Sequence, residues 1–293
     1  MAIGFIADHF LEDFAGGAEH SDEALILRLL AHGDVHRCRS RAVTVEWLEQ
    51  HRQGPILVAN ALQLQPGHRR WLEQSGTPYF ILEHDHHYLR GRNPCLFPDW
   101  RPPAEELCHL SFYGAARWVV CQSSLHEQIL RRCTGLENTW SQGTNFWRPD
   151  WLAVIRRLRQ QGMRWPERTA VMQSQTPVKN TQGALELCRQ RGWSVDALPS
   201  MGYPEFLQTL GCYGRLVFLP GWVESFSRLV AEAGMLGLEI VSNRWVGLLE
   251  EPWLQPLLRD DRRLAPELID CIAERNTWAV QQLLTRLTSE GQR

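Results

Sequence analysis

Short apolar segments rich in β-branched and aromatic residues alternate along most of the chain with segments of helical spacing. This alternation is typical of a parallel β-sheet whose connecting helices cover its faces. Strands are predicted at residues 2–7, 56–60, 79–82, 118–122, 168–173, 194–197, 216–219 and 239–242. Helices are predicted at residues 21–32, 104–117, 123–133, 181–191, 204–210, 225–236 and 276–287, with another opened by Pro66. The expected fold class is therefore α/β.

A stretch rich in Gly, Asn and Pro at residues 142–149 interrupts the alternation near the middle of the chain. A length of 293 residues suits about two domains of roughly 150 residues each. We therefore expect an N-terminal domain at residues 1–147, a C-terminal domain at residues 148–275 and a last helix within residues 276–293.

Composition and charge narrow the class of protein. The net charge of −2 removes any strong expectation of nucleic-acid binding. No apolar run approaches the ~18–20 residues that span a bilayer, and the first ten residues do not resemble a signal peptide. Eight dispersed cysteines without a C-x-x-C pair indicate reduced thiols rather than a disulfide scaffold or a zinc ribbon. A cytoplasmic protein is expected.

Gly16 and Gly17 lie between the first predicted strand and the first predicted helix. Paired glycines let a ligand approach the backbone closely, and a helix N-terminus supplies amides that favour an anion. A tight turn, with Glu19 favourably placed for the helix dipole, explains the same residues without a ligand. The pair alone falls short of a full G-x-G-x-x-G motif.

The run Glu83-His84-Asp85-His86-His87 stands at the C-terminal end of a predicted strand. In open α/β sheets that edge is where ligands bind. Imidazole and carboxylate groups there could bind a metal, act as a base or contact hydroxyls. Because no third ligand stands at a useful spacing, the run favours a contact with sugar or phosphate over a metal site. A solvated loop is the third interpretation.

Lys179 is the single lysine among 31 basic residues, and it lies between the strand predicted at 168–173 and the helix predicted at 181–191. An ammonium group beside free amides suits a diphosphate. The alternative is a solvated surface lysine. The replacement of lysine by arginine everywhere else in the chain weakens that alternative.

Glu224 and Glu232 stand eight residues apart, the first in a loop after a predicted strand and the second in the helix predicted at 225–236. The amides of residues 225–227 would form the N-terminus of that helix, which is an anion site. A capping Glu224 and a surface Glu232 would need no ligand. The helix is otherwise apolar, however, so two carboxylates on one side of it call for a reason.

Taken in order, these motifs resemble the retaining GT-B glycosyltransferases of glycosyltransferase family 4. Residues 220–233 are similar to the family signature P-S-x-x-E-x-F-G-x-x-x-x-E-A, with Glu224 and Glu232 at its two glutamates. The glycine loop at 16–19, the His84-Asp85-His86 run and Lys179 are similar to three further family features. Residues 118–123 and 142–149 also match family segments, so the resemblance extends from about residue 2 to residue 250.

Three positions depart from the family pattern. Ser174 stands where an arginine is usual, so charge neutralisation of a diphosphate would be incomplete or come from elsewhere, for instance from Arg228. Ser225 and Ser227 stand where small glycines are common, which would narrow the donor pocket.

The resemblance implies two Rossmann-like domains facing a cleft, the N-terminal one on the acceptor side and the C-terminal one on the nucleotide-sugar side. It also implies that the C-terminal helix packs back toward the N-terminal domain. It implies a metal-independent hexosyltransferase that moves a sugar with retention from a UDP- or GDP-sugar to a hydroxyl acceptor, with no other cofactor. Glu224, His84 and Lys179 would be catalytic, and Glu232 would hold the ribose hydroxyls. The residues implied in donor binding are Glu232, Gly16, Gly17, Ser225, Phe226, Ser227 and Arg228.

Other interpretations stay open at this level. A nucleotide-sugar epimerase or phosphorylase would share the fold, a hydrolase would use the histidines with a metal, and a non-catalytic relative would bind the nucleotide-sugar without turnover. The acceptor could be a saccharide, a lipid or another hydroxyl compound, and nucleic acid is not expected. Residues 151–164, which are apolar and basic, could rest weakly on an anionic membrane but are more typical of a domain-packing helix.

Overall fold

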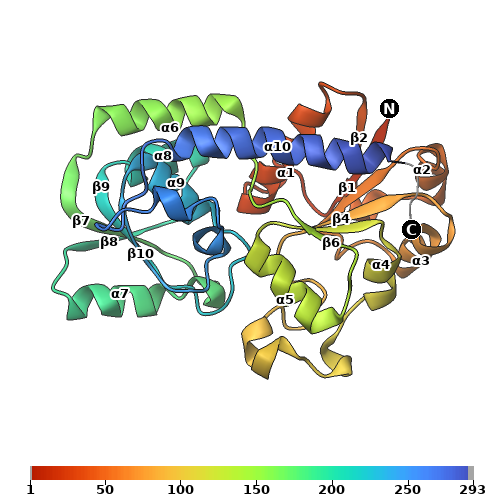
Figure 1. The fold of residues 1–293 in the computed structure, drawn as a ribbon, viewed down its shortest axis with the longest axis horizontal. Helices are drawn as coiled ribbons and strands as arrows, with labels where there is room; N and C mark the ends of the chain where they lie inside the picture. Colours follow the sequence, from red (N-terminus) through yellow and green to blue (C-terminus); the bar gives the residue numbers. More distant parts are fainter. Residues whose placement is uncertain (1, 290–293) are drawn as a thin grey trace. The chain divides into compact units, whose positions relative to one another are not determined.

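The computed structural model describes residues 2–289, which divide into two compact units. The N-terminal unit contains residues 1–147 and 276–293, and the C-terminal unit contains residues 148–275. Each unit is built around one parallel sheet, so the α/β class predicted from the sequence is confirmed. Figure 1 shows both units with their helices and strands.

The N-terminal unit has a sheet with the strand order β2-β1-β3-β4-β5-β6, in which every pair of neighbours is parallel. Its strands are β1 (Ile3–Ala7), β2 (Val35–Arg39), β3 (Ile56–Ala59), β4 (Tyr79–Glu83), β5 (Trp118–Cys121) and β6 (Thr139–Ser141). Its connecting helices are α1 (Gly17–Leu29), α2 (Val45–Gln50), α3 (Pro66–Gln74), α4 (Leu110–Ala115) and α5 (Ser124–Thr134).

The sequence order of these strands reverses its direction at one place in the sheet. The chain passes from β1 outward to β2 and then returns to β3 on the other side of β1. Beyond the carboxyl ends of β1 and β3 the connections therefore diverge, which leaves a crevice where ligands bind in this class of sheet. The residues that follow β1 and β3 therefore border this crevice.

The C-terminal unit repeats the same plan with the strand order β10-β9-β7-β8, again fully parallel. Its strands are β7 (Trp165–Met172), β8 (Val195–Leu198), β9 (Tyr213–Phe218) and β10 (Glu239–Ser242). Its helices are α6 (Pro149–Gln161), α7 (Thr181–Gln190), α8 (Tyr203–Leu210) and α9 (Arg228–Leu236). Here the reversal lies between β7 and β9, so the loops after those two strands border the crevice.

Helix α10 (Leu268–Thr288) is longer than the helix predicted at 276–287, and the division of the chain falls within it. Four of its side chains, Ala279, Val280, Leu283 and Leu287, join the main apolar core of the N-terminal unit. That core also contains Ile3 and Phe5 of β1 and Leu25 of α1. The expectation that the last helix packs back on the N-terminal domain is therefore confirmed.

One predicted helix and the two edge strands of the N-terminal sheet differ between the prediction and the structure. The helix predicted at 104–117 is a 3₁₀ turn at Ala104–Glu106 followed by α4, because His109 adopts a left-handed conformation with φ 57° and Pro102 and Pro103 restrict the backbone before it. Strands β2 and β6 were not predicted. Both lie at the edges of the sheet, β2 is mostly polar, and β6 is only three residues long.

Candidate functional site

Lys179 and Glu224 meet at the crevice of the C-terminal unit. The loop after β7 and the loop after β9 are joined by two hydrogen bonds, one from Asn180 Nδ2 to the Leu219 carbonyl (2.8 Å) and one from the Gly221 amide to the Val178 carbonyl (2.8 Å). These bonds bring the Lys179 Nζ atom to 2.7 Å from Glu224 Oε1. Two residues 45 positions apart thus form one ion pair, as their places after neighbouring strands predict.

The pair is accessible from solvent on its lysine side. The Lys179 side chain is 35% exposed and that of Glu224 is 13% exposed. An ammonium group carries three N–H donors, so Lys179 can bond to Glu224 and to a further anion together. Lys179 is thus half-buried and paired with Glu224 rather than fully solvated.

Glu232 lies inside α9 rather than on its surface, with 2% of the residue exposed. Its Oε1 atom accepts hydrogen bonds from the Tyr203 hydroxyl (2.7 Å) and from Arg228 Nη2 (3.1 Å). Arg228 is also buried and donates to the Tyr203 hydroxyl at 3.1 Å. Burial, and then the charge of Glu232, raises the pKa of Tyr203 above its usual range. The alternative of a solvated Glu232 is therefore wrong.

The helix that carries Glu232 begins at Arg228, three residues later than predicted. Ser227 takes φ 77° and ψ 91°, which is not helical, and its hydroxyl accepts from the Val230 amide at 3.5 Å. The amides of Ser225 and Phe226 therefore belong to a loop and not to the helix N-terminus, and that expectation is corrected. Phe226 is fully buried, backbone included, and its carbonyl accepts from the Leu248 amide at 3.0 Å.

Ser174, which replaces an arginine of the family pattern, borders a small cavity in the C-terminal unit. The cavity has a volume of about 360 Å³ and lies between the end of β7 and the start of α7. The Ser174 amide donates to Thr181 Oγ1 at 3.1 Å, which fixes the loop against α7. Arg228 bonds to Glu232 and Tyr203, so its guanidinium already has partners within α8 and α9.

In the N-terminal unit, Gly16 is the N-cap of α1 and Gly17 is its first residue. No side chain caps the helix through Gly16. A Cβ atom on Gly16 would lie 2.5 Å from Glu19 Oε2 and 2.5 Å from the Phe14 ring. The glycine thus makes room for the Glu19 carboxylate, which folds back over the helix N-terminus. Burial, reinforced by Asp22, raises the pKa of Glu19.

His84 follows directly after β4 and is buried at the carboxyl edge of the sheet. Its Nε2 atom lies 3.0 Å from Asp22 Oδ1 of α1, and the side-chain amide of Gln122 hydrogen-bonds to Nδ1. Burial alone would lower the pKa of His84, but the charge and hydrogen bond of Asp22, with Asp85 and Glu83, raise it to about 9. The ring is therefore held in a fixed orientation and favours the protonated form at neutral pH.

The histidines of the run do not share a face. The strand ends at Glu83, and His86 takes φ 57°, which turns its ring toward Tyr88 (2.8 Å) and away from His84. Within residues 2–289 no group of three His, Cys, Asp or Glu side chains is placed to hold a metal ion.

Glu83 was predicted only as part of the run 83–87 and received no role of its own from the sequence. Its Oε1 atom accepts from the amides of Asp85 and His87, both at 3.0 Å, and its Oε2 atom accepts from the Tyr113 hydroxyl. Burial would raise the pKa of Glu83, but His87 together with these bonds holds it well below its usual range. A charged residue at the end of an otherwise apolar strand, Tyr79–Glu83, was the available signal.

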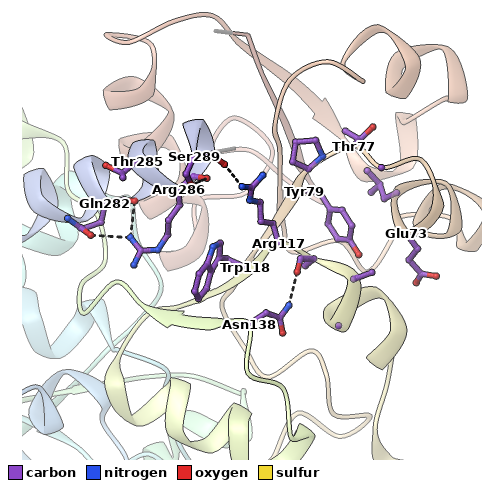
Figure 2. Close-up of a pocket in the computed structure, with 16 residues that line it drawn as sticks. Glu73, Thr77, Tyr79, Arg117, Trp118, Asn138, Gln282, Thr285, Arg286 and Ser289 are labelled. Carbon is purple, nitrogen blue, oxygen red and sulfur yellow. Dashed lines mark hydrogen bonds between the residues drawn. The ribbon is translucent and has the colours of Figure 1, made fainter. Parts of the chain in front are cut away.

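A larger cavity of about 1030 Å³ lies at the opposite, amino edge of the N-terminal sheet (Figure 2). It is bordered by Tyr79 and Trp118, the first residues of β4 and β5, and by Arg286 of α10. Ligands of open parallel sheets bind at the carboxyl edge, so size alone does not make this cavity the site.

Two expectations concern contact with a membrane. In the described part of the chain no helix is both long and apolar enough to cross a membrane. The apolar and basic segment at 151–164 contributes most of α6, whose Leu152 and Ile155 are buried and whose Trp151 ring packs on Tyr203 of α8. This packing favours the domain-packing interpretation.

Comparisons with known proteins give no match to a family model and no match to a curated protein. Solved structures do match. The Anabaena protein Alr3699/HepE, in complex with UDP-glucose, gives a TM-score of 0.55 at 15% identity over 98% of this chain and 92% of that chain. An alpha-glucosyltransferase in complex with UDP and a 13-mer DNA gives a TM-score of 0.55 at 10% identity over 99% of this chain and 100% of that chain.

A third match is AviGT4, a glycosyltransferase involved in avilamycin A biosynthesis, with a TM-score of 0.51 at 12% identity over 98% of this chain and 97% of that chain. All three cover nearly the whole of both chains. At such low identities the likeness shows the fold. The chain has the GT-B fold, with two Rossmann-like domains, in agreement with the fold expected from its sequence.

Proposed function

We propose that the protein is a retaining glycosyltransferase of the family 4 type that moves a sugar from a UDP- or GDP-sugar to a hydroxyl acceptor. The observation that carries the proposal is the Lys179–Glu224 pair at the carboxyl edge of the C-terminal sheet. Its neighbours in fold support it, since HepE binds UDP-glucose and the alpha-glucosyltransferase binds UDP.

The chemistry proposed for this site is a substitution at the anomeric carbon. A bond forms from the acceptor oxygen to that carbon, the bond to the diphosphate oxygen breaks, and the acceptor proton passes to the leaving phosphate. Negative charge grows on the diphosphate, and Lys179 is placed to stabilise it. Glu224 holds the ammonium in position and offers its carboxylate to the hydroxyls of the sugar.

The remaining site residues keep their proposed roles with two adjustments. Glu232 would bind the ribose hydroxyls by exchanging part of its contact with Arg228 and Tyr203. The anion-binding amides of α9 would be those from Arg228 onward, since the helix begins there. Gly16, Gly17 and His84 are retained for the donor, His84 because its hydrogen bonds fix its ring at the edge of the sheet.

The acceptor proposed is a saccharide, a lipid or another hydroxyl compound. One neighbour in fold binds DNA, but this chain has a net charge of −2, which does not favour a nucleic-acid acceptor. Neither a metal ion nor another cofactor is part of the proposal.

The first experiment identifies the donor by measuring the melting temperature of the protein in the presence of different UDP- and GDP-sugars. A ligand that binds only the folded state stabilises it by mass action. The donor that stabilises the protein is then offered with candidate acceptors, and the anomeric configuration of the product is read by NMR. Release of nucleoside diphosphate with retention, unaffected by a chelator, is the expected result. Inversion, or activity that a chelator abolishes and zinc or manganese restores, would contradict the mechanism.

A non-catalytic nucleotide-sugar-binding protein is the second candidate. Two observations favour it: Ser174 replaces the usual arginine, and Arg228 is engaged with Glu232. This candidate predicts stabilisation by the same donors without turnover for any acceptor. An epimerase or phosphorylase would instead convert the donor alone or with inorganic phosphate.

A further inference from the structure

A small pocket opens at the carboxyl edge of the N-terminal sheet, beside the site of His84. It has a volume of about 30 Å³ and is bordered by Asn60 after β3, Arg69 of α3 and His109 before α4. Glu83 lines both this pocket and the one that His84 lines. A volume of this size holds about two water molecules or one carboxylate or phosphate group, with the rest of a ligand outside.

Arg69 contributes a cation to this pocket that no carboxylate neutralises by contact. Its Nη2 atom donates to the carbonyls of Ala61 (2.9 Å) and Leu62 (3.2 Å), and its Nη1 atom lies 3.2 and 3.3 Å from the two ring nitrogens of His109. None of the ion pairs formed by residues 2–289 includes Arg69.

The two carboxylates that act on Arg69 through space are occupied elsewhere. Asp8 accepts from the amides of Leu62 (2.8 Å) and Gln63 (3.0 Å), and Glu73 accepts from the Ser111 hydroxyl at 3.1 Å. Burial lowers the pKa of Arg69, which measures the cost of holding a charge there without a partner. An anion would remove that cost.

His109 adds a second donor that responds to such an anion. Partial burial lowers its pKa, and Arg69 and His87 lower it further while Glu73 opposes them. A ligand anion in contact with both His109 and Arg69 would stabilise the imidazolium and reverse this shift. The site would then offer two cationic donors to one acidic group.

Asn60 adds a hydrogen-bond acceptor to the same pocket. It directly follows β3, takes φ 37°, and its Oδ1 atom is buried without a hydrogen-bond partner among the described residues. An unpaired buried acceptor needs a donor, and a sugar hydroxyl is one. The position lies beside the crevice between β1 and β3, where the sheet order places a ligand.

From this arrangement we infer that the N-terminal unit binds the acceptor through an anionic group held by Arg69 and His109, with a neighbouring hydroxyl donating to Asn60. The acceptor class is an acidic saccharide, carrying either a carboxylate or a phosphate. The assignment of this ligand as the acceptor rests on the proposed function, whereas the anion site itself does not.

The test measures binding to the full chain without any nucleotide-sugar, by calorimetry and by NMR, using glucuronate, glucose 6-phosphate and glucose as probes. At least one acidic probe is expected to bind ten times more tightly than glucose, and the two acidic probes distinguish carboxylate from phosphate. Arg69→Gln should weaken that binding about tenfold or more, as expected for loss of a hydrogen bond to a charged group. Arg70→Gln, at the exposed neighbouring position on α3, is the matched control and should leave it unchanged.

His109→Asn is a second variant that leaves the contacts of Arg69 with Ala61 and Leu62 in place, and asparagine tolerates the left-handed backbone at this position. Glucuronate stays ionised above about pH 5, so its affinity for the wild type should rise as pH falls from 7.5 to 5.5, and the His109 resonances should report a raised pKa in the complex. In His109→Asn this rise should disappear.

Equal binding of glucose and both acidic probes, or equal losses in Arg69→Gln and Arg70→Gln, would overturn the anion site. Absence of sugar transfer, with selective binding of an acidic probe intact, would instead overturn the proposed function alone. An Arg69→Gln protein with a lowered melting temperature would leave His109→Asn to decide, since a pH dependence unchanged in that variant also contradicts the inference.

Discussion

The ammonium of Lys179 lies 2.7 Å from the carboxylate of Glu224, across the gap between two loops that leave adjacent strands. Each member of the pair fixes the other, so neither has to be ordered by the ligand. A donor that enters this site meets an oriented cation, and an oriented charge is what stabilises a developing negative charge most effectively.

Lys179→Arg should lower turnover by roughly 30- to 1000-fold, because a planar guanidinium cannot replace a compact ammonium beside a diphosphate. This range corresponds to about 2–4 kcal/mol of lost stabilisation. The arginine can keep an ion pair with Glu224, so the melting temperature without ligand should hardly change. The matched control is Arg189→Lys in the exposed pair with Glu186. Wild-type turnover and donor affinity in Lys179→Arg would remove the residue from the site.

Glu232→Ala should lower the free energy of unfolding by about 3–5 kcal/mol, since it leaves the buried Arg228 without its carboxylate. Glu232→Gln keeps an acceptor for Tyr203 and Arg228 and should cost less. Both variants should bind the donor about tenfold or more weakly. Urea denaturation and calorimetry measure the two effects, with Glu186→Ala as a surface control. Full donor affinity in Glu232→Gln would argue that the carboxylate serves the fold alone.

Ser227→Gly should stabilise the protein by about 1 kcal/mol. The positive φ of Ser227 strains a residue with a Cβ atom, and glycine removes a cost of about 1–3 kcal/mol while losing a weak cap and gaining unfolded-state entropy. Ser225→Gly relieves no such strain and should be neutral or destabilising. Chemical denaturation of the two variants side by side decides this, and a Ser227→Gly protein less stable than Ser225→Gly would show that the backbone is not strained there.

The buried His84–Asp22 pair predicts a specific pH dependence of stability. The pKa of His84 is raised to about 9 in the folded state from about 6.5 in the unfolded state, so its stabilisation is present below pH 6.5 and is lost as pH rises toward 9. Between about pH 6.5 and about pH 8.5 the free energy of unfolding should fall by about 2 kcal/mol from this group.

Asp22→Asn should remove most of that slope, and Asp85→Asn, at the exposed neighbouring position, should change it less. Burial lowers the pKa of His126 and raises those of Cys121 and Cys133. These groups change the free energy of unfolding mainly outside the range of about pH 6.5–8.5, and any change inside this range is the same in Asp22→Asn and Asp85→Asn. Denaturant titrations at several pH values measure the slope. The same slope in Asp22→Asn and in the wild type would contradict the pairing.

The strands and the edge that carries the site could be predicted because local patterns determine them. Residues 56–59, 79–82 and 216–218 are continuous apolar runs within β3, β4 and β9. The residues after β7 and β9 had to meet once those strands were neighbours in a parallel sheet. From the sequence, Lys179 and Glu224 could each be placed in a loop after a strand, and the pairing of β7 with β9 then brings the two loops together.

The partners of the side chains at this edge depend on tertiary contacts, so the spacing of residues in the sequence could not predict them. The burial of Glu232 against Tyr203 requires α8 and α9 to pack together, and the late start of α9 depends on the backbone of Ser227. No role could be assigned to Glu83 within its run, because its partner Tyr113 lies on a distant segment and its bonds to His87 form only where the chain turns after β4.

Because four side chains of α10 complete the apolar core around Phe5 and Leu25, the N-terminal unit depends on residues that the ribosome makes after the whole of the C-terminal unit. Its six strands emerge early, yet their core stays open until residues 279–287 have been released. The C-terminal unit has all of its residues by position 275. During translation the C-terminal unit is therefore the first that can finish folding. The apolar face of the N-terminal sheet stays exposed until α10 is made, and during that time it is prone to aggregation.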